Sequence, residues 1–283
     1  MRDKVCIITG ASSGIGRATA LSLSRMGATV VMVARDAGRG QAALEELRTA
    51  SGNHDVDLLL ADLSSQAEVR RLAKELGSRY PQLHVLINNA GVAPVKRQVT
   101  KDGMEMAFAV NYLAPFLLTN LLLDPLKAGA PARVVNVAGD FHRKATIKFG
   151  DLMSEKDYNG VQANNQAKLA LILFTYELAR RLDGVGVTAN CLHPGAVATG
   201  APLRDPDLSA FGRLMYTLVK PFFLSPDKGA ETSIFLATSP EVERVTGKYF
   251  VKKAPVRSSP ESYDEEIARR LWDRSAQLAG LAA

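Results

Sequence analysis

The sequence predicts one doubly wound α/β domain with a mainly parallel sheet flanked by helices. Strand-like apolar segments with β-branched residues occur at 5–9, 29–34, 56–61, 85–87, 133–138 and 187–192. Helical patterns separate them and begin near Gly14, Ala37, Ser65, Asp102 and Gly160. Repeated strand–helix–strand units form parallel sheets, because parallel strands need a crossover connection. No linker interrupts the 283 residues, so we expect a single domain over residues 1–283.

The first strand is followed by the glycine-rich turn Thr9-Gly10-Ala11-Ser12-Ser13-Gly14-Ile15-Gly16. Glycines at 10, 14 and 16 allow a sharp turn and let backbone amides approach a pyrophosphate at a helix N-terminus. A glycine loop alone is a weak signal. This one opens the first strand–helix unit, where a dinucleotide-binding Rossmann domain requires it.

The ends of the second and third strands indicate which dinucleotide binds. Enzymes that use NAD usually place an acid at the tip of the second strand, where it accepts the ribose 2′-hydroxyl. Here Ala34 occupies the tip, and the guanidinium of Arg35 follows, which suits a 2′-phosphate. We expect Asp36 to cap the next helix. The sequence therefore favours NADPH over NADH, with Asp62 and Leu63 at the third strand end beside the adenine.

The segment 106–123 carries no charged residue over eighteen positions, close to the lower limit for a membrane span. It contains Asn111, Pro115, Thr119 and Asn120, so a long buried helix explains it better than a span. We expect this helix to lie between the sheet and a second subunit, in a homodimer or homotetramer.

The strand–helix alternation breaks between residues 200 and 227, where apolar and aromatic residues punctuate a proline-containing stretch. This composition suits a lid over a substrate. A pair of surface helices packed on the core explains it equally well.

Composition and charge argue against several other classes. The net charge is +6, but Lys and Arg are interspersed with acids in EELR, EVRRLAKE and DEEIARR, a pattern typical of solvated helix faces rather than nucleic-acid binding. Cys6 and Cys191 lie in apolar runs without metal-ligand or disulfide spacing, so we expect buried thiols and no metal. The N-terminus leads straight into a strand, so we expect a cytoplasmic protein without membrane attachment.

These motifs resemble the short-chain dehydrogenase/reductase family along nearly the whole chain. The glycine turn matches TGxxxGxG, Asn88-Asn89-Ala90-Gly91 matches NNAG, and Pro194-Gly195-Ala196-Val197-Ala198-Thr199 matches PGxVxT. Asn111 matches a helix asparagine that holds a water in the family's proton relay. The segments ILFTYELARRL and IARRLWD resemble the retinol-dehydrogenase-like branch, whose N-terminal anchor we expect to be absent. The resemblance implies cofactor contacts from Thr9, Gly10, Ser12, Ser13, Gly14, Ile15, Gly16, Asn89, Ala90, Gly91, Lys168, Pro194, Gly195, Val197 and Thr199.

Two hydroxyl groups that the family uses for proton transfer are missing. The family's lysine is present as Lys168, but Asn164 stands where the tyrosine is expected, four residues earlier. Gly139 stands where a serine normally follows the fifth strand. Four nearby groups are unconvincing replacements, because we expect loop packing for Tyr158, loop capping for Asp140, exposure for His142 and a structural role for His193.

The missing acid restricts the chemistry. Reducing a ketone creates alkoxide character, about as basic as hydroxide, with a water pKa of about 15.7. Reducing a quinone gives a phenolate-like anion whose conjugate acid has a pKa of about 10. The pKa difference of roughly 6 units means that the phenolate needs about 8 kcal/mol less stabilisation than the alkoxide. We expect the amide donors of Asn164 and the positive charge of Lys168 to stabilise the phenolate-like anion, together with Asn111.

The leading hypothesis is therefore an NADPH-dependent reductase of a quinone-like or polycyclic aromatic acceptor. The composition, rich in alanine and arginine, hints at a bacterial source with GC-rich DNA, where related enzymes modify aromatic polyketides. Two alternatives stay open at this point. The fold could serve a non-redox cyclase, dehydratase or epimerase, or a catalytically silent NADPH-binding protein.

Overall fold

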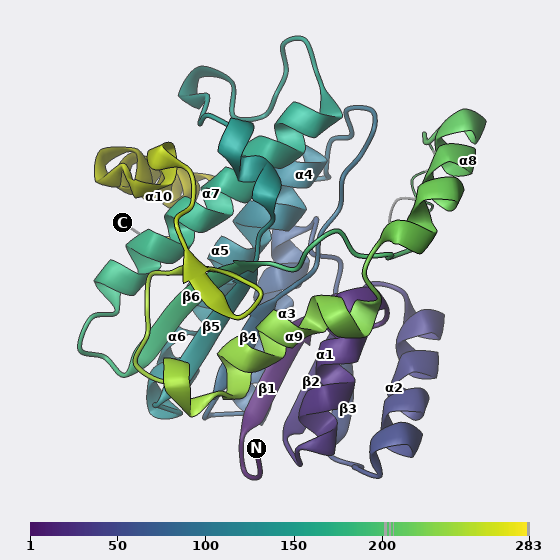
Figure 1. Ribbon diagram of the computed structural model, residues 1–283. Helices are drawn as coiled ribbons and strands as arrows, with labels where there is room; N and C mark the ends of the chain where they lie inside the picture. Colours follow the sequence, from purple (N-terminus) through teal and green to yellow (C-terminus); the bar gives the residue numbers. More distant parts are fainter. Residues whose placement is uncertain (201–202, 204, 206, 282–283) are drawn as a thin grey trace.

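The computed structural model of the protein describes residues 1–200, 203, 205 and 207–281 (Figure 1). Its eight strands form one sheet of order β3-β2-β1-β4-β5-β6-β7-β8. They are β1 (Val5–Thr9), β2 (Thr29–Ala34), β3 (Val56–Leu60), β4 (Val85–Asn88), β5 (Ala132–Val137), β6 (Val187–His193), β7 (Tyr249–Val251) and β8 (Ala254–Val256). All neighbours pair in parallel except β7 and β8.

This strand order confirms the predicted doubly wound Rossmann domain. The chain progresses from β1 to β3 on one side and from β4 to β6 on the other. The direction reverses between β1 and β4, and a crevice forms outside the carboxyl ends of strands at such a point. The glycine turn after β1 and the NNAG motif at β4 both lie there.

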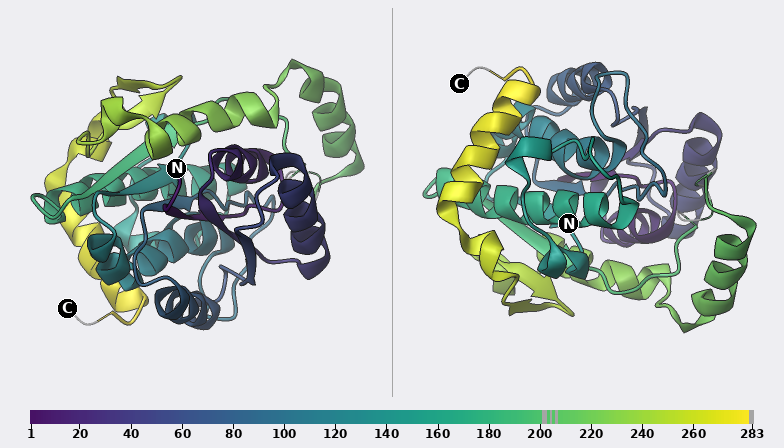
Figure 2. Two further views of the ribbon diagram at one scale, coloured as in Figure 1. Left: turned by 90° about the horizontal axis from the view of Figure 1, so that it is seen from below. Right: turned by 90° about the horizontal axis from the view of Figure 1, so that it is seen from above.

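Helices cover both faces of the sheet, as the two views of Figure 2 show. One face carries α1 (Gly14–Arg25), α2 (Ala37–Ser51) and α9 (Pro226–Thr238), which share a buried core with the strands. The other face carries α3 (Gln66–Arg79), α4 (Met106–Phe108), α5 (Ala114–Leu121), α6 (Leu123–Ala128), α7 (Gly160–Arg181) and α10 (Glu265–Leu278). Cys6 and Cys191 are free thiols buried on opposite faces, as predicted.

Most of the expected elements form within one residue of their predicted ends, but one helix start is wrong. The helix expected near Asp102 begins at Met106, where the Glu105 carboxylate caps it by accepting from the backbone N–H of Phe108 at 2.7 Å. Asp102 instead accepts from the backbone N–H of Gln66 at 2.7 Å, at the start of α3. Strands β7 and β8 were not predicted.

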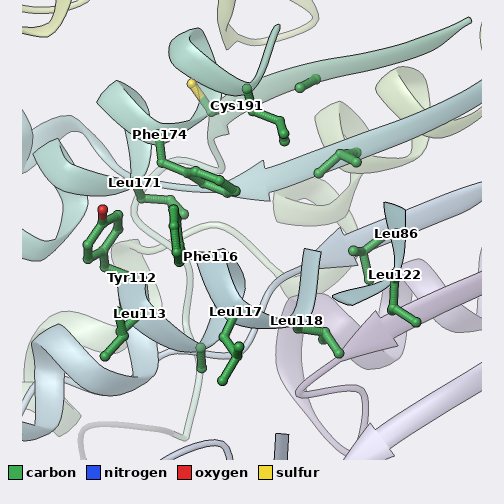
Figure 3. Close-up of a cluster of buried hydrophobic side chains, with 14 of the residues drawn as sticks. Leu86, Tyr112, Leu113, Phe116, Leu117, Leu118, Leu122, Leu171, Phe174 and Cys191 are labelled. Carbon is green, nitrogen blue, oxygen red and sulfur yellow. The ribbon is translucent and has the colours of Figure 1, made fainter. Parts of the chain in front are cut away.

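The apolar segment around α4 and α5 is buried within its own chain. Ala107 to Thr119 are all buried, and Figure 3 shows Tyr112, Phe116 and Leu117 within the core cluster. Trp272 of α10 packs edge-on against Phe116 at 5.0 Å, and the Tyr112 hydroxyl meets that of Ser275 at 2.5 Å. The expected reason for oligomerisation is therefore wrong, because α10 already covers this helix. The oligomeric state itself stays a prediction.

The segment expected as a lid contains α8 (Ala210–Val219), which stands away from the body of the molecule (Figure 1). None of its side chains is buried, so the alternative of a helix pair packed on the core is wrong for α8. Residues 201, 202, 204 and 206 of the expected lid lie outside the described residues. In the described part of the chain, no helix combines the length and apolar character needed to cross a bilayer.

Candidate active site

The glycine turn after β1 forms a cradle that side chains would obstruct. Gly10 has a φ of +69°, and a Cβ there would lie 2.9 Å from the Cα of Ala90. A Cβ on Gly16 would lie 2.4 Å from Asn89 Nδ2. The cradle therefore requires glycine at both positions, as expected for a backbone that approaches a pyrophosphate.

Thr9 and Asn89 tie the cradle to the β4 loop. The Thr9 hydroxyl accepts from the backbone N–H groups of Asn89 and Ala90 at 2.9 and 3.0 Å. Asn89 Nδ2 donates to the carbonyl of Thr9 at 2.8 Å. Since Thr9 is buried, its side chain holds the site together rather than facing it. Ser12, Ser13 and Ile15 lie on the turn itself, at the start of α1.

The loop after β6 closes the other side of the cradle. Gly195 has a φ of +87°, and a Cβ there would lie 2.6 Å from Leu224 Cδ1. Thr199 Cγ2 lies 3.2 Å from where a Cβ on Gly14 would be. The structure therefore brings together the glycine turn and the loop of Pro194, Gly195, Val197 and Thr199, which are distant in the sequence.

At the ends of β2 and β3 the structure confirms the predicted Asp36 cap, and the cofactor contacts of Arg35, Asp62 and Leu63 stay predictions. Arg35 is exposed immediately after β2, and no described residue pairs with its guanidinium. Asp36 caps α2 by accepting from the backbone N–H of Arg39 at 2.8 Å, and that hydrogen bond lowers its pKa. Asp62 accepts from the backbone N–H of Ser64 at 3.0 Å and the side chain of Leu63 packs on the core. These two residues therefore also shape the turn after β3.

Asn111, Asn164 and Lys168 meet beside Gly91. Asn111 lies in a π-helical turn, Ala109–Leu113, of a type often found at functional sites. Its Nδ2 donates to Asn164 Oδ1 at 2.9 Å and to the carbonyl of Val92 at 2.7 Å. A Cβ on Gly91 would lie 3.3 Å from Asn111 Oδ1 and 3.7 Å from Lys168 Nζ.

The Val92 backbone determines how both amides are oriented. Its N–H can only donate, so the Asn111 atom that it meets at 2.8 Å is Oδ1. Both hydrogens of Asn111 Nδ2 are then used, on Val92 and Asn164, and neither remains for the water that the resemblance implied. Asn164 accepts through Oδ1, so its own Nδ2 points away from Asn111. No described residue accepts from that Nδ2.

Among the described residues, Lys168 has one hydrogen-bond partner, the carbonyl of Val137, to which its Nζ donates at 3.0 Å. Burial lowers its pKa to about 8, since no described carboxylate forms an ion pair with it. The ammonium keeps two further donors for a bound ligand.

Gly139 follows β5 with an extended backbone, at a φ of 160°. A Cβ built there would have no atom within 4 Å. The absence of a serine therefore does not reflect crowding at this position.

The other polar residues near the strand ends are held in structural roles. Tyr158 donates to the buried Glu105 carboxylate at 3.2 Å, consistent with loop packing. The prediction of an exposed His142 is wrong, because the ring is buried. His142 Nδ1 donates to the Gly139 carbonyl at 2.7 Å and Nε2 accepts from the Ser259 backbone at 3.1 Å, which defines a neutral tautomer. Burial lowers its pKa.

Asp140 and His193 complete this group. Asp140 pairs with Arg143 at 2.7 Å at the start of a short 3-10 turn, an ion pair rather than the expected backbone cap. His193 ends β6, and burial lowers the pKa of its ring. Within the described residues its buried Nδ1 has no hydrogen-bond partner. No pattern in the sequence indicates this unpaired nitrogen.

The residues present fit an NADP(H) molecule. The glycine cradle would hold the pyrophosphate, Arg35 the 2′-phosphate, and Lys168 and the 194–199 loop the nicotinamide end. These segments follow the carboxyl ends of the strands, on both sides of the point where the strand order reverses.

Comparison with known proteins gives the same result. Residues 4–203 match the sequence profile of the family described as short chain dehydrogenase. Retinol dehydrogenase 14 of Homo sapiens is 44% identical, over 99% of this chain and 88% of its own length. The crystal structure of an uncharacterized protein from Mycobacterium paratuberculosis has a TM-score of 0.77 at 32% identity, covering 99% of this chain and 94% of its own. A short chain dehydrogenase from Burkholderia cenocepacia, solved with NADP, has a TM-score of 0.69 at 25% identity, covering 88% and 96%.

Proposed function

The chain belongs to the short-chain dehydrogenase family and is an NADP(H)-binding oxidoreductase, and from this premise we propose that it reduces a quinone-like or polycyclic aromatic acceptor. The proposal starts from the two absent hydroxyls at Gly139 and Asn164. Without a strong proton donor, the favoured acceptor is one whose reduced oxygen is a stable anion. A phenolate meets that condition better than an alkoxide by about 8 kcal/mol.

The observation that carries the proposal is the orientation of the Asn164 amide. Asn111 donates a hydrogen bond to Asn164 Oδ1, so the two N–H donors of Asn164 are left for a ligand. A neutral amide donor is too weak to protonate an alkoxide-like oxygen fully. It can, however, stabilise an oxygen whose charge is spread over an aromatic ring.

Each residue then has a defined task. NADPH, when bound, would supply a hydride, and a quinone that gains this hydride and becomes aromatic is a hydroquinone monoanion, whose charge lies on a phenolate oxygen. Lys168 holds the nicotinamide ribose and places a positive charge beside the reacting oxygen. Asn164 donates to that oxygen, and Asn111 acts as a positioning residue that fixes the amide. Water protonates the released phenolate.

The cofactor proposal gives a prediction for Arg35. NADPH should bind the native protein about tenfold or more tightly than NADH, a difference of about 1.4 kcal/mol, because Arg35 pairs with the 2′-phosphate. Arg35→Ala should remove most of that preference while leaving NADH affinity unchanged, as measured by fluorescence titration. Arg25→Ala, at the far end of α1, is the matched control. Equal affinities of the native protein for the two nucleotides would show that the strand tip does not select the phosphate.

The acceptor class is tested with a panel of acceptors in stopped flow, following NADPH absorbance. Polycyclic quinones should oxidise NADPH at a measurable rate, and aliphatic ketones should stay near background. Retinaldehyde tests the substrate suggested by the names of the relatives, and it should also be slow because its reduction creates an alkoxide. The quinone rate should fall as the pH rises through about 8, since Lys168 then loses its charge.

Two outcomes would contradict the proposal. If no quinone oxidises NADPH bound to the protein, the quinone reductase interpretation is wrong. If retinaldehyde reacts faster than every quinone, the acceptor is a retinoid-type aldehyde, and another residue supplies the proton.

A further inference from the structure

A continuous apolar stripe runs along the outside of α8 and the turn that follows it. Phe211, Leu214, Met215 and Leu218 recur at intervals of three and four residues, so they share one side of α8. Phe222 follows them at the end of the 3-10 turn Lys220–Phe222. Their exposed fractions range from 42% for Met215 to 88% for Phe222. We call these five residues the α8 stripe. Apolar side chains at helical spacing normally face a core, and these face solvent.

The polar side of α8 is the one attached to the protein. The Arg213 guanidinium donates to the carbonyls of Leu203 and Asp205, each at 2.7 Å. The Tyr216 hydroxyl donates to the carbonyl of Thr199. These contacts hold the helix with its stripe outward, and both views of Figure 2 show α8 apart from the helical layers.

The charges around the stripe favour a negatively charged surface. No carboxylate occurs between Asp207 and Asp227, whereas Arg213 and Lys220 lie within that interval. The whole chain carries a net charge of +6. An apolar helix face that is flanked by a lysine and has no acid nearby has the character of a segment that lies in a membrane interface.

A second copy of the chain fits the stripe less well. A ten-residue helix is about 15 Å long and about 10 Å wide, so one face covers on the order of 150 Å² in projection. A standard interface buries about 800 Å² per partner. A bilayer, in contrast, accepts a short helix lying flat and needs no matching surface.

We propose that the α8 stripe docks the protein on the surface of an anionic phospholipid bilayer. The stripe continues toward the site, because Leu224 exchanges backbone hydrogen bonds with the 196–198 loop and lies against Gly195. Docking therefore places the entrance of the cofactor crevice next to the lipid. The docking itself does not depend on which acceptor is reduced.

The test is sedimentation with vesicles of equal parts phosphatidylglycerol and phosphatidylcholine. The native protein should sediment with these vesicles and less with pure phosphatidylcholine. Leu214→Glu combined with Leu218→Glu should lower the bound fraction about tenfold or more, since two charges then enter the apolar face. NADPH affinity, which reports an intact site, should stay unchanged.

Met26→Glu is the matched control. Met26 is 42% exposed at the C-terminal end of α1, outside the α8 stripe, and its substitution should leave sedimentation unchanged. The proposal is overturned if the native protein stays in the supernatant, or if Met26→Glu lowers binding as much as the double variant. It is also overturned if the double variant instead converts a dimer to a monomer in light scattering, because the stripe would then bind a second copy.

Discussion

Asn164→Ala should lower the rate of quinone reduction about 10²–10³-fold, the range for removing one donor to a developing oxygen anion. The alanine removes the only donors of the Asn111–Asn164 pair that face the site. Because this hydrogen bond strengthens as charge develops, kcat and kcat/KM should fall together. Stopped-flow measurement of NADPH absorbance at saturating quinone gives the rate directly.

Two further variants separate catalysis from structure at this position. Asn164→Asp still accepts from Asn111 but has no amide N–H, so its loss should be at least as large. Gln162→Ala changes an exposed residue on the same helix and should keep the native rate. A loss of less than about threefold in Asn164→Ala would contradict the donor role and leave Asn164 as a space-filling residue.

Restoring both hydroxyls, with Gly139→Ser and Asn164→Tyr together, should raise ketone reduction about 10²-fold or more. A positioned general acid contributes about 10²–10⁴-fold to such reactions. The structure accommodates the serine, because the Gly139 backbone is extended and nothing lies within 4 Å of its added Cβ. The tyrosine would stand one helical turn before Lys168, whose charge lowers the pKa of a neighbouring phenol.

The control for this gain is Gly139→Ser with Asn164→Phe, which has the ring but not the hydroxyl. This variant should show no gain in ketone reduction at the same NADPH concentration. If both double variants gain equally, the added ring acts by packing rather than by proton transfer. If neither gains although both bind NADPH, the site lacks a ketone-binding geometry.

The fold could be predicted because its signals are local. Glycines at 10, 14 and 16 and the alternation of apolar periods are properties of short segments. The start of α4 could not be placed, because Asp102 is of a type preferred at helix N-caps and Glu105 is not. Only the folded chain assigns Asp102 to α3 and Glu105 to α4. The short strands β7 and β8 could not be predicted either, because they form only by pairing at the edge of the sheet beside β6.

The candidate site likewise has features that the sequence predicts and features that only the folded chain determines. Its residues could be named from the sequence through the resemblance of their motifs to the short-chain dehydrogenase family, and this includes Gly139, Asn164 and Lys168. The direction of the Asn164 amide could not, because it depends on the Val92 backbone acting through Asn111. The burial of His142 depends on Ser259, more than a hundred positions later.

The hydrogen bonds of Thr9 have a consequence for ligand association. They link the loops after β1 and β4 to the interior, so the nucleotide cradle belongs to the cooperative unit of the domain rather than to mobile surface segments. The conformational entropy of these loops is then lost when the chain folds, not when the nucleotide arrives. Nucleotide association should therefore resemble the docking of two rigid bodies, with little of the interaction energy consumed in ordering the protein.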